Sequence, residues 1–432
     1  MTAPPERDRY TPQAAVTVVA PVLTGAKAAL RELLEELGAD PAHNAILPLG
    51  RLDTLHFARF VVLEAALALD GSDLPASLVF LSDIDGPPEA YLRELVRNSL
   101  SGIDRIYGHC EDYPAAGGAA AALAYLRTHL ATPAAMYVNT VGRSVNQVRR
   151  EAHLHDALQG RLDALAPLLR GATPTKARTA IRRAVAADSA LAWARYPVPK
   201  PSLVTRAREL LGLTRVVLTV LVVAPLMFLA LPFLAVVLRL RERSDPAPDV
   251  WPDLTRVREL AAREDLGVQN QFTAVGFVKP GRFRLWTAIA VLWLVNAGVR
   301  IAFSRGSLAG VTTIHFARWV LIDDNRRLLF ASNYDGSLES YMDDFIDRLA
   351  WGLNAVFSNG VGYPRTSWLI GGGARAEGAF KRFIRTHQVP TQVWYSAYDR
   401  LTAVNIANNA AVRAGLSGAM NEAASRRWLR RL

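Results

Sequence analysis

The chain has 432 residues, an apolar fraction of 51% and a formal net charge of +11, which allows about two or three domains with a sizeable core. Arginine supplies 45 of the 50 basic residues. These arginines gather beside apolar stretches without interleaved aromatic residues, so the charge favours a membrane surface and we expect no nucleic-acid partner. The single cysteine, Cys110, excludes internal disulfides and thiolate metal clusters. The N-terminus MTAPPERDRY has no apolar signal segment, which makes us expect a protein at the cytoplasmic face.

Two long parts of the chain carry the same pattern. The matching segments are 54–64 with 313–323, 78–91 with 328–341, and 133–143 with 390–400. The distance from the glycine of an Asp-Gly pair to a later Tyr-Pro tyrosine is also the same, 27 residues from Gly86 to Tyr113 and from Gly336 to Tyr363. An internal duplication of this kind predicts a pseudo-two-fold molecule built from two copies of about 150 residues.

Both copies predict the element order β-α-β-β-α-β. In the first copy, alternating or β-branched runs predict strands at 14–22, 54–64, 77–82 and 134–141, with helices at 25–37 and 88–107. In the second copy the strands are expected at 269–278, 312–322, 327–332 and 391–398, with helices at 282–303 and 337–357. This is the order of the split βαβ, ferredoxin-like unit. The predicted fold class is therefore α+β, with two ferredoxin-like repeats forming an intrachain pseudo-dimeric α+β barrel.

The same pattern predicts the division of the chain. Residues 1–149 form the first ferredoxin-like repeat, and residues 150–205, rich in alanine and arginine, form an appended helical segment. Residues 206–246 form an apolar membrane-associated helical hairpin, and residues 247–432 form the second repeat with a basic C-terminal tail.

The apolar run 216–238 has 23 uncharged residues and is long enough to span a bilayer. A single crossing would, however, place the two copies on opposite sides of the membrane. We therefore predict a monotopic protein in which Pro225 and Pro232 kink the run into a shallow hairpin. The second apolar stretch, 284–302, would lie beside it, with Trp286, Trp293 and Arg239 at the interface. The alternatives are a buried core helix and a single- or double-pass membrane protein.

Candidate chemistry lies on the second strand of each copy. Alternation places His56 on one face and Arg59 on the other, so either the histidine or the arginine would face the interior. Arginine is costly against a helix layer, which favours Arg59 and Arg318 inside, with Asp85 and Asp335 as their partners. The alternative is that each Arg–Asp pair simply holds the turn after the third strand.

The second copy offers the richer set of polar and aromatic groups. We predict His315, Arg318, Tyr334 and Asp335 as catalytic residues and no metal site. The further candidates are Trp319, Asn333, Trp394, Tyr395 and Tyr398. At the positions that match Trp319, Tyr334, Trp394, Tyr395 and Tyr398, the first copy has Phe60, Ile84, Tyr137, Val138 and Val141. His153-Leu154-His155 is a weaker signal, because no carboxylate cluster accompanies it in the sequence.

The duplicated order resembles the dimeric α+β barrel superfamily, and one local element is similar to that of dye-decolourising peroxidases. Those enzymes carry a GxxDG element whose aspartate works with an arginine on peroxide beside haem. The nearest runs here are 82–86 and 332–336, each with serine in place of the first glycine. The resemblance implies a membrane-associated oxidoreductase acting on a lipophilic substrate, with haem as a possible cofactor. The alternative is a non-enzymatic membrane-bound binding or scaffold protein.

Overall fold

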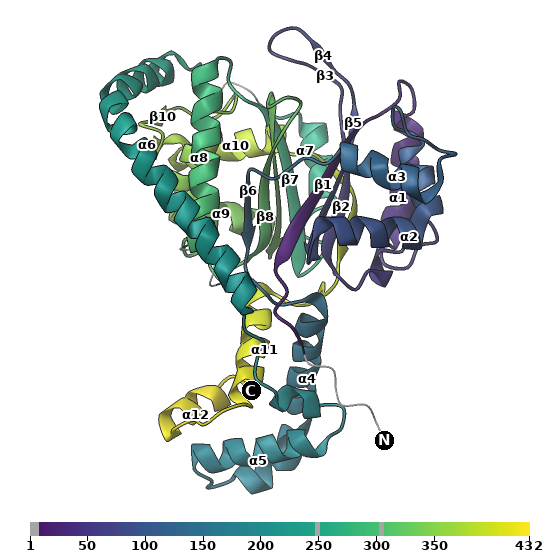
Figure 1. Cartoon of the computed structure of the whole chain (residues 1–432), viewed down its shortest axis with the longest axis vertical. Helices are drawn as coiled ribbons and strands as arrows, with labels where there is room; N and C mark the ends of the chain where they lie inside the picture. Colours follow the sequence, from purple (N-terminus) through teal and green to yellow (C-terminus); the bar gives the residue numbers. More distant parts are fainter. Residues whose placement is uncertain (1–7, 247–250, 302–305) are drawn as a thin grey trace.

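The computed structural model describes residues 8–246, 251–301 and 306–432 and has a mixed α+β architecture (Figure 1). Two four-stranded antiparallel sheets form its centre. The first sheet has the order β1 (Gln13–Pro21), β5 (Ser77–Asp85), β2 (Leu55–Leu63) and β12 (Thr391–Ser396). The second has the order β6 (Ala135–Val138), β8 (Ile314–Ile322), β9 (Arg327–Asp335) and β7 (Gln269–Phe277). Strands therefore form where the β-branched and alternating runs predict them.

Each sheet takes one edge strand from the other half of the chain. β6 pairs with β8, although β6 precedes the apolar segment and β8 follows it. In the same way, β12 pairs with β2. Just before each of these pairings, the chain hydrogen-bonds to the first strand of its own copy: Ala131 N donates to Thr17 O at 2.8 Å, and Val389 N donates to Thr273 O at 2.9 Å. Both halves of the chain are thus tied into both sheets.

Helices cover the outer face of each sheet (Figure 1). The first sheet carries α1 (Lys27–Ala39), α2 (Pro88–Tyr107) and α3 (Gly118–Thr128), and the second carries α8 (Arg282–Ile301), α9 (Leu338–Phe357) and α10 (Glu377–His387). α2 shows why these segments are helical: Leu92, Leu95 and Val96 form one buried stripe at helical spacing. Residues 302 and 303 of the helix expected at 282–303 lie outside the described residues.

The inner faces of the two sheets pack on each other. Aliphatic side chains from both sheets form one buried cluster there, which includes Val61, Leu81, Val320 and Leu329. Each such buried side chain contributes about 2 kcal/mol to stability. The space between the sheets is therefore filled by side chains over this part of the interface.

A separate helical unit lies below the sheets (Figure 1). It comprises α4 (Val145–Leu169), α5 (Pro174–Ala187), α11 (Ala403–Gly415) and α12 (Glu422–Leu429). The predicted segment 150–205 supplies most of its first two helices, although α4 begins five residues earlier, and the basic tail supplies part of the last. Trp428 of that tail is buried, and its Nε1 donates to Val412 O at 2.9 Å. The tail is thus fixed in this unit, while Arg426 and Arg427 remain exposed.

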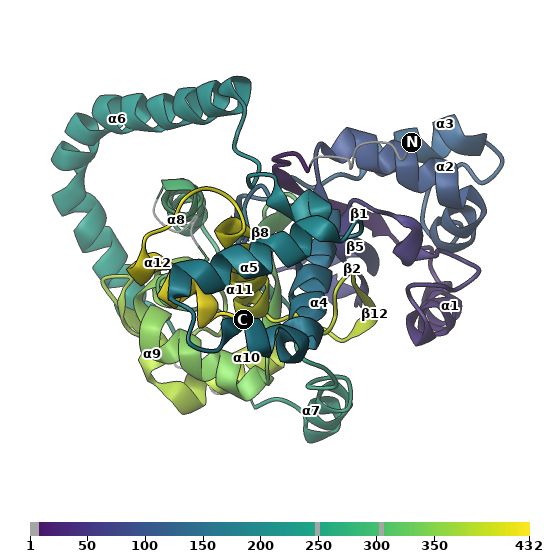
Figure 2. The same cartoon turned by 90° about the horizontal axis from the view of Figure 1, so that it is seen from below.

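The apolar segment is one long helix, α6 (Leu203–Ser244), and not a hairpin. Pro225 and Pro232 both lie inside it, and Figure 2 shows that the helix bends. The predicted hairpin is wrong because a proline removes one helical hydrogen bond and kinks the axis without reversing the chain. Directly after α6, Asp245 accepts hydrogen bonds from Lys279 Nζ at 2.6 Å and Arg284 Nη2 at 2.7 Å. The C-terminal end of α6 is therefore fixed to the body. A short helix, α7 (Leu254–Ala261), follows.

Candidate functional site

A β-bulge lies at each of the two predicted histidines. The pairing register of β2 with β5 shifts between Leu55 and Phe57, and that of β8 with β9 shifts between Ile314 and Phe316. The extra residue interrupts the alternation on which the prediction depended. His56 and Arg59 consequently both lie between the sheets, so the expectation that only one of them would do so is wrong.

Arg59 crosses from the first sheet to the second. Its Nη1 donates to Phe272 O at 2.8 Å and to Thr273 Oγ1 at 2.9 Å. Its Nη2 donates to Ser332 O at 2.8 Å and also to the Asn333 side-chain oxygen. Arg59 is buried, and its own contacts in the described structure are with neutral oxygen atoms. Burial lowers its pKa to about 9, with Asp83 raising the value and Arg318 lowering it further.

Arg318 makes the equivalent crossing in the opposite direction. Its Nη1 donates to Val16 O at 2.7 Å and to Thr17 Oγ1 at 3.2 Å. Its Nη2 forms an ion pair with Asp83. The predicted partners, Asp335 for Arg318 and Asp85 for Arg59, are therefore wrong, because each arginine extends to the facing sheet and not along its own.

Asp85 and Asp335 instead connect the two histidines to helix N-termini. His56 Nε2 lies 3.0 Å from Asp85 Oδ1, and the backbone N–H of Val145, at the start of α4, donates to the other oxygen at 2.8 Å. His315 Nε2 lies 2.6 Å from Asp335 Oδ1, and Ala403 N at the start of α11 donates to Oδ2 at 2.7 Å. A carboxylate here satisfies a free N–H group and complements the helix dipole. The alternative in which an Arg–Asp pair holds the turn is therefore also wrong, because each aspartate contacts a histidine and a helix start and not the arginine.

Strand exchange moves the aromatic residues of the second copy beside the first. Tyr398 Oη lies 2.8 Å from His56 Nδ1, and burial raises the pKa of Tyr398 well above its ordinary value. Trp394 Nε1 donates to Asn333 Oδ1 at 3.2 Å. The residue matching Tyr398 in the first copy is Val141, which cannot supply a hydroxyl. Tyr398 therefore contacts His56, whereas Asp335 contacts His315. The groups predicted to form one site in the second copy thus contact different histidines.

Tyr334 lies on the other face of β9, among the residues that pack under the helices. Its ring stacks on Tyr341 with centroids 4.0 Å apart, and its hydroxyl has no hydrogen-bond partner among the described residues. Burial raises its pKa. Trp319 and Tyr395 also belong to the helix-covered cores. Strand alternation could have shown this, because Tyr334 directly follows the inward-facing Asn333.

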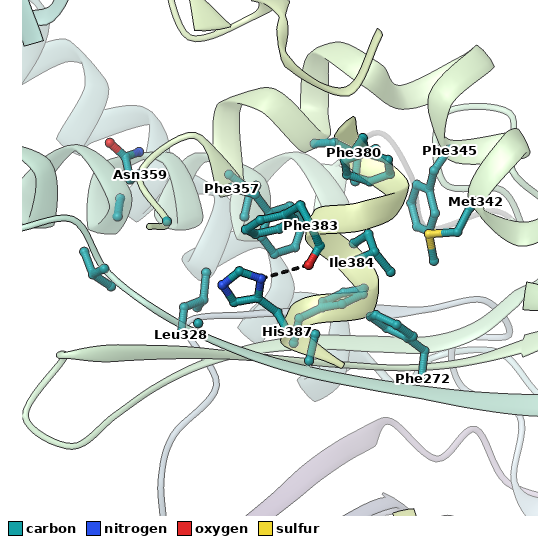
Figure 3. Close-up of a pocket in the computed structure, with 18 residues that line it drawn as sticks. Phe272, Leu328, Met342, Phe345, Phe357, Asn359, Phe380, Phe383, Ile384 and His387 are labelled. Carbon is teal, nitrogen blue, oxygen red and sulfur yellow. Dashed lines mark hydrogen bonds between the residues drawn. The ribbon is translucent and has the colours of Figure 1, made fainter. Parts of the chain in front are cut away.

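Neither of two cavities detected in the structure contains the predicted polar groups. One is an apolar cavity of about 40 Å³ on the outer face of the second sheet, where His387 Nδ1 lies 2.8 Å from Phe383 O (Figure 3). The other is a surface groove of about 770 Å³ lined by residues of both charges, such as Arg31 and Glu64. His56, Arg59, His315 and Arg318 line neither.

The buried histidines do not fit the implied haem. An axial ligand needs a free ring nitrogen that faces a space large enough for the macrocycle. Both ring nitrogens of His56 are engaged, by Tyr398 and Asp85. Nε2 of His315 is engaged by Asp335, and both histidines are buried under aromatic rings such as Phe57 and Phe316.

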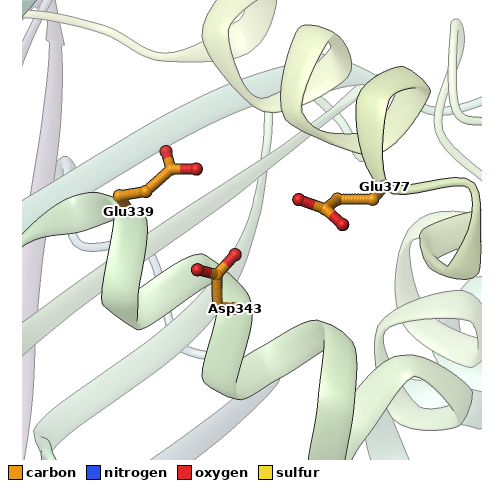
Figure 4. Close-up of side chains that lie close together, drawn as sticks. All are labelled: Glu339, Asp343 and Glu377. Carbon is orange, nitrogen blue, oxygen red and sulfur yellow. The ribbon is translucent and has the colours of Figure 1, made fainter.

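One acidic cluster is present at the surface. Carboxylate oxygens of Glu339, Asp343 and Glu377 lie within 4.8 Å of one another (Figure 4). Lys381 Nζ pairs with all three, at 2.8 Å from Asp343 and 2.7 Å from Glu377, and these contacts raise its pKa. The lysine ammonium thus already supplies the cation. Among the described residues no comparable group includes His153 or His155.

The predicted membrane residues lie on an exposed apolar surface. Within the part of α6 from Leu203 to Leu226, a stretch of 18 residues has a mean hydropathy of 1.9, and none of this stretch is buried. Trp286 and Trp293 of α8 are exposed, whereas Ala288 and Leu292 on its other face are buried. Pro225 and Pro232 are exposed, and Arg239 Nη1 donates to Glu242 at 3.1 Å. α6 is thus long and apolar enough to cross a membrane.

Comparison with protein-family models, curated proteins and solved structures found no match for this chain. Its function therefore has to be inferred from its own residues.

Proposed function

We propose that the chain is a monotopic membrane protein, attached through α6 and the exposed face of α8, whose two packed sheets serve as a non-enzymatic scaffold. The observation that carries this proposal is the strand exchange across α6. β6 precedes α6, and β7 follows α6 before α8 begins, yet both strands belong to the same sheet. Both ends of α6 must then lie on the same side of a bilayer. A long exposed apolar helix under this constraint lies in the membrane interface instead of crossing it.

We further propose that the two sheets are ferredoxin-like repeats closed into one α+β barrel. The residues before β6 hydrogen-bond to β1 and those before β12 hydrogen-bond to β7. The segment that leads into β6 thus bonds to the first sheet before β6 joins the second sheet. The segment that leads into β12 makes the reverse connection, so each of them links the two sheets. Such closure leaves few free strand edges, which suits a rigid support for membrane-binding helices.

The scaffold role is supported by how the interior polar groups are used. Arg59 and Arg318 are buried, and their guanidinium groups donate hydrogen bonds to oxygen atoms of the facing sheet. Asp85 and Asp335 each accept hydrogen bonds from a histidine and from a helix N-terminus. A binding site for a small molecule normally combines an open apolar pocket with a few polar groups that point into it. The arginines and aspartates here instead bond to other parts of the protein.

The second candidate is the peroxidase-like oxidoreductase acting on a lipophilic substrate. One observation favours it, the buried chain from Tyr398 through His56 to Asp85, because a phenol beside an imidazole can exchange a proton during oxidation. This candidate predicts peroxide-dependent turnover of a lipophilic phenol that is abolished in Tyr398→Phe. The scaffold proposal predicts a colourless purified protein without a Soret band and no such turnover.

The membrane proposal is tested by placing a charge on α6. The double variant Leu221→Glu/Val222→Glu should lower binding to anionic vesicles by at least about tenfold, because carboxylates are costly in the apolar layer. The matched control is Leu67→Glu in the β3–β4 hairpin (Ala66–Leu67 and Asp73–Leu74), since Leu67 is equally exposed but distant from α6. Vesicle flotation measures both. Unchanged binding of the α6 variant would contradict the proposal.

The proposed location is the cytoplasmic face of the membrane. The arginines that follow the apolar run, such as Arg239, Arg241 and Arg243, are of the kind retained beside anionic cytoplasmic lipids. Flotation with neutral vesicles as the comparison measures this electrostatic contribution.

A further inference from the structure

We infer that the tip of a small hairpin enters the membrane interface beside α6, an inference that rests on the proposed attachment of α6. The hairpin pairs β10 (Thr366–Ser367) with β11 (Gly371–Gly372). Its tip, residues 368–370, presents two large apolar side chains, and Trp368 and Ile370 are each 53% exposed. Large apolar side chains that are exposed next to another exposed apolar surface mark a place for an apolar partner.

The tip is held in a backbone conformation that costs free energy. Trp368 has φ of 57° and Leu369 has φ of 65°, so two consecutive non-glycine residues occupy the left-handed region. Such a conformation persists only where surrounding contacts enforce it. Consecutive residues of this kind can direct their N–H groups to one side and so form a binding concavity for an anion.

Glu242 of α6 is the anion that fills this concavity. Its carboxylate accepts from Trp368 N at 2.9 Å and from Leu369 N at 2.8 Å, and from Thr366 Oγ1 at 3.1 Å. Glu242 is buried although it lies in the last turn of a largely exposed helix. The carboxylate therefore couples the hairpin directly to α6, and the tip occupies a fixed position beside that helix.

The surroundings of the tip match the chemistry of a bilayer interface. The guanidinium of Arg239 lies 5.8 Å from the centre of the Trp368 ring, and Arg241 and Arg243 follow on the same helix end. Tryptophan beside arginine at the end of an apolar helix is typical of the headgroup layer. The partner we assign to the tip is thus an anionic lipid surface, continuous with the one proposed for α6.

The test uses an environment-sensitive fluorophore on single introduced cysteines in the full chain. Cys110 is buried, so labelling is directed to Ile370→Cys at the tip, Leu221→Cys on α6 and Leu67→Cys in the β3–β4 hairpin. With vesicles of phosphatidylcholine and phosphatidylglycerol, the labels at 370 and 221 should shift to the blue and be quenched by brominated lipid. The label at 67 should do neither.

The outcomes separate this inference from the membrane proposal. A shift at 221 without one at 370 overturns the inference and leaves the attachment of α6 standing. The absence of a blue shift at both 370 and 221 would overturn both the inference about the hairpin tip and the proposed attachment of α6. Equal shifts at 370 and 67 would reveal non-specific adsorption and would also overturn the inference. Replacing Trp368 and Ile370 by alanine should raise the lipid concentration for half-binding by about tenfold, because two partly exposed apolar groups no longer enter the interface.

Glu242 acts as a positioning residue, and Glu242→Gln tests that role. The amide keeps the size of the side chain but loses the charge that the two N–H groups bind. We expect the label at 370 to lose at least about half of its blue shift while the label at 221 keeps its own. Circular dichroism confirms that the variant is folded. A full shift at 370 in this variant would overturn the positioning role.

Discussion

Asn333 and Asp83 occupy matching positions in the two halves of the chain and contact each other between the sheets, with Asn333 Nδ2 donating to Asp83 Oδ2 at 2.9 Å. Asp83 forms the ion pair with Arg318, whereas Asn333 accepts from Arg59. Arg318 therefore contacts this carboxylate directly, whereas Arg59 is connected to it only through the Asn333 side chain. The two matching positions therefore lie side by side between the sheets but differ in charge.

This asymmetry predicts different sensitivities at the two matching positions. Asp83→Asn should lower the free energy of unfolding by about 3–5 kcal/mol, because it removes the ion-pair partner of buried Arg318 and the negative charge nearest to buried Arg59. Asn333→Asp supplies a carboxylate next to Arg59 but loses the N–H group that Asp83 accepts from, so it should cost less than Asp83→Asn. Chemical denaturation of both variants measures the difference. Equal losses in the two variants would show that the charge balance does not matter.

Tyr334, although predicted as catalytic, should be replaceable. Its buried hydroxyl has no partner among the described residues, so Tyr334→Phe keeps the stacking on Tyr341 and removes an unsatisfied polar group. We expect the free energy of unfolding to rise by up to about 1 kcal/mol at pH 8. Tyr341→Phe is the matched control, since its hydroxyl donates to Ser332 Oγ at 2.6 Å and its loss should destabilise. A destabilised Tyr334→Phe would point to a function for the hydroxyl.

Buried tyrosines also predict a loss of stability at high pH. Burial raises the pKa of Tyr91, Tyr341 and Tyr398 above the ordinary value of 10.0. Below pH 10 these groups are neutral in both states and contribute no pH dependence. Above it the unfolded chain releases protons that the folded chain retains, so stability falls as pH rises.

Arg59 acts in the opposite direction above pH 9, because its lowered pKa favours proton release from the folded state. Arginine is nevertheless almost always protonated in proteins. The effect of this one group on the pH dependence of stability should therefore be smaller than the combined effect of the buried tyrosines. Denaturation at pH 8 and pH 11 should therefore show lower stability at pH 11. A higher value at pH 11 would mean that the arginine dominates.

Removing either aspartate at a helix start should affect folding first. Asp335→Asn weakens the contacts to His315 and to Ala403 N and should cost about 1–2 kcal/mol, and Asp85→Asn should cost a similar amount through His56 and Val145 N. Asp343→Asn, an exposed carboxylate in the lysine-paired cluster, is the control for charge removal alone. Thermal unfolding compares the three. A variant of Asp335 with full stability but altered turnover would instead support the catalytic prediction.

The positions of strands and helices could be predicted from the sequence because each element's own alternation determines its type. Strand exchange could not, since nothing in β6 or β12 distinguishes the edge of one sheet from the edge of the other. The bulges at His56 and His315 could not be predicted either, because one extra residue in a strand does not change its amino-acid composition in a recognisable way. For this reason the inward-facing arginines were predicted, but their partners were not.

The membrane segment shows a similar limit. The length and apolarity of 216–238 predicted a membrane-associated helical segment, but the two prolines did not reveal whether the chain would bend or reverse. Glu242 was missed altogether. Its signal was available, as an acidic residue within the basic run RLRER at 239–243, but its partners are backbone N–H groups more than a hundred residues away.

The claim that both halves lie on one side of the membrane is tested most directly by labelling with a membrane-impermeant maleimide in sealed vesicles of known orientation. Leu67→Cys precedes α6 and Val404→Cys follows it; both positions are exposed, and Cys110 is buried. We predict that both cysteines react from the same side, the cytoplasmic one, and that neither reacts from the other. Labelling of the two positions from opposite sides would contradict the account.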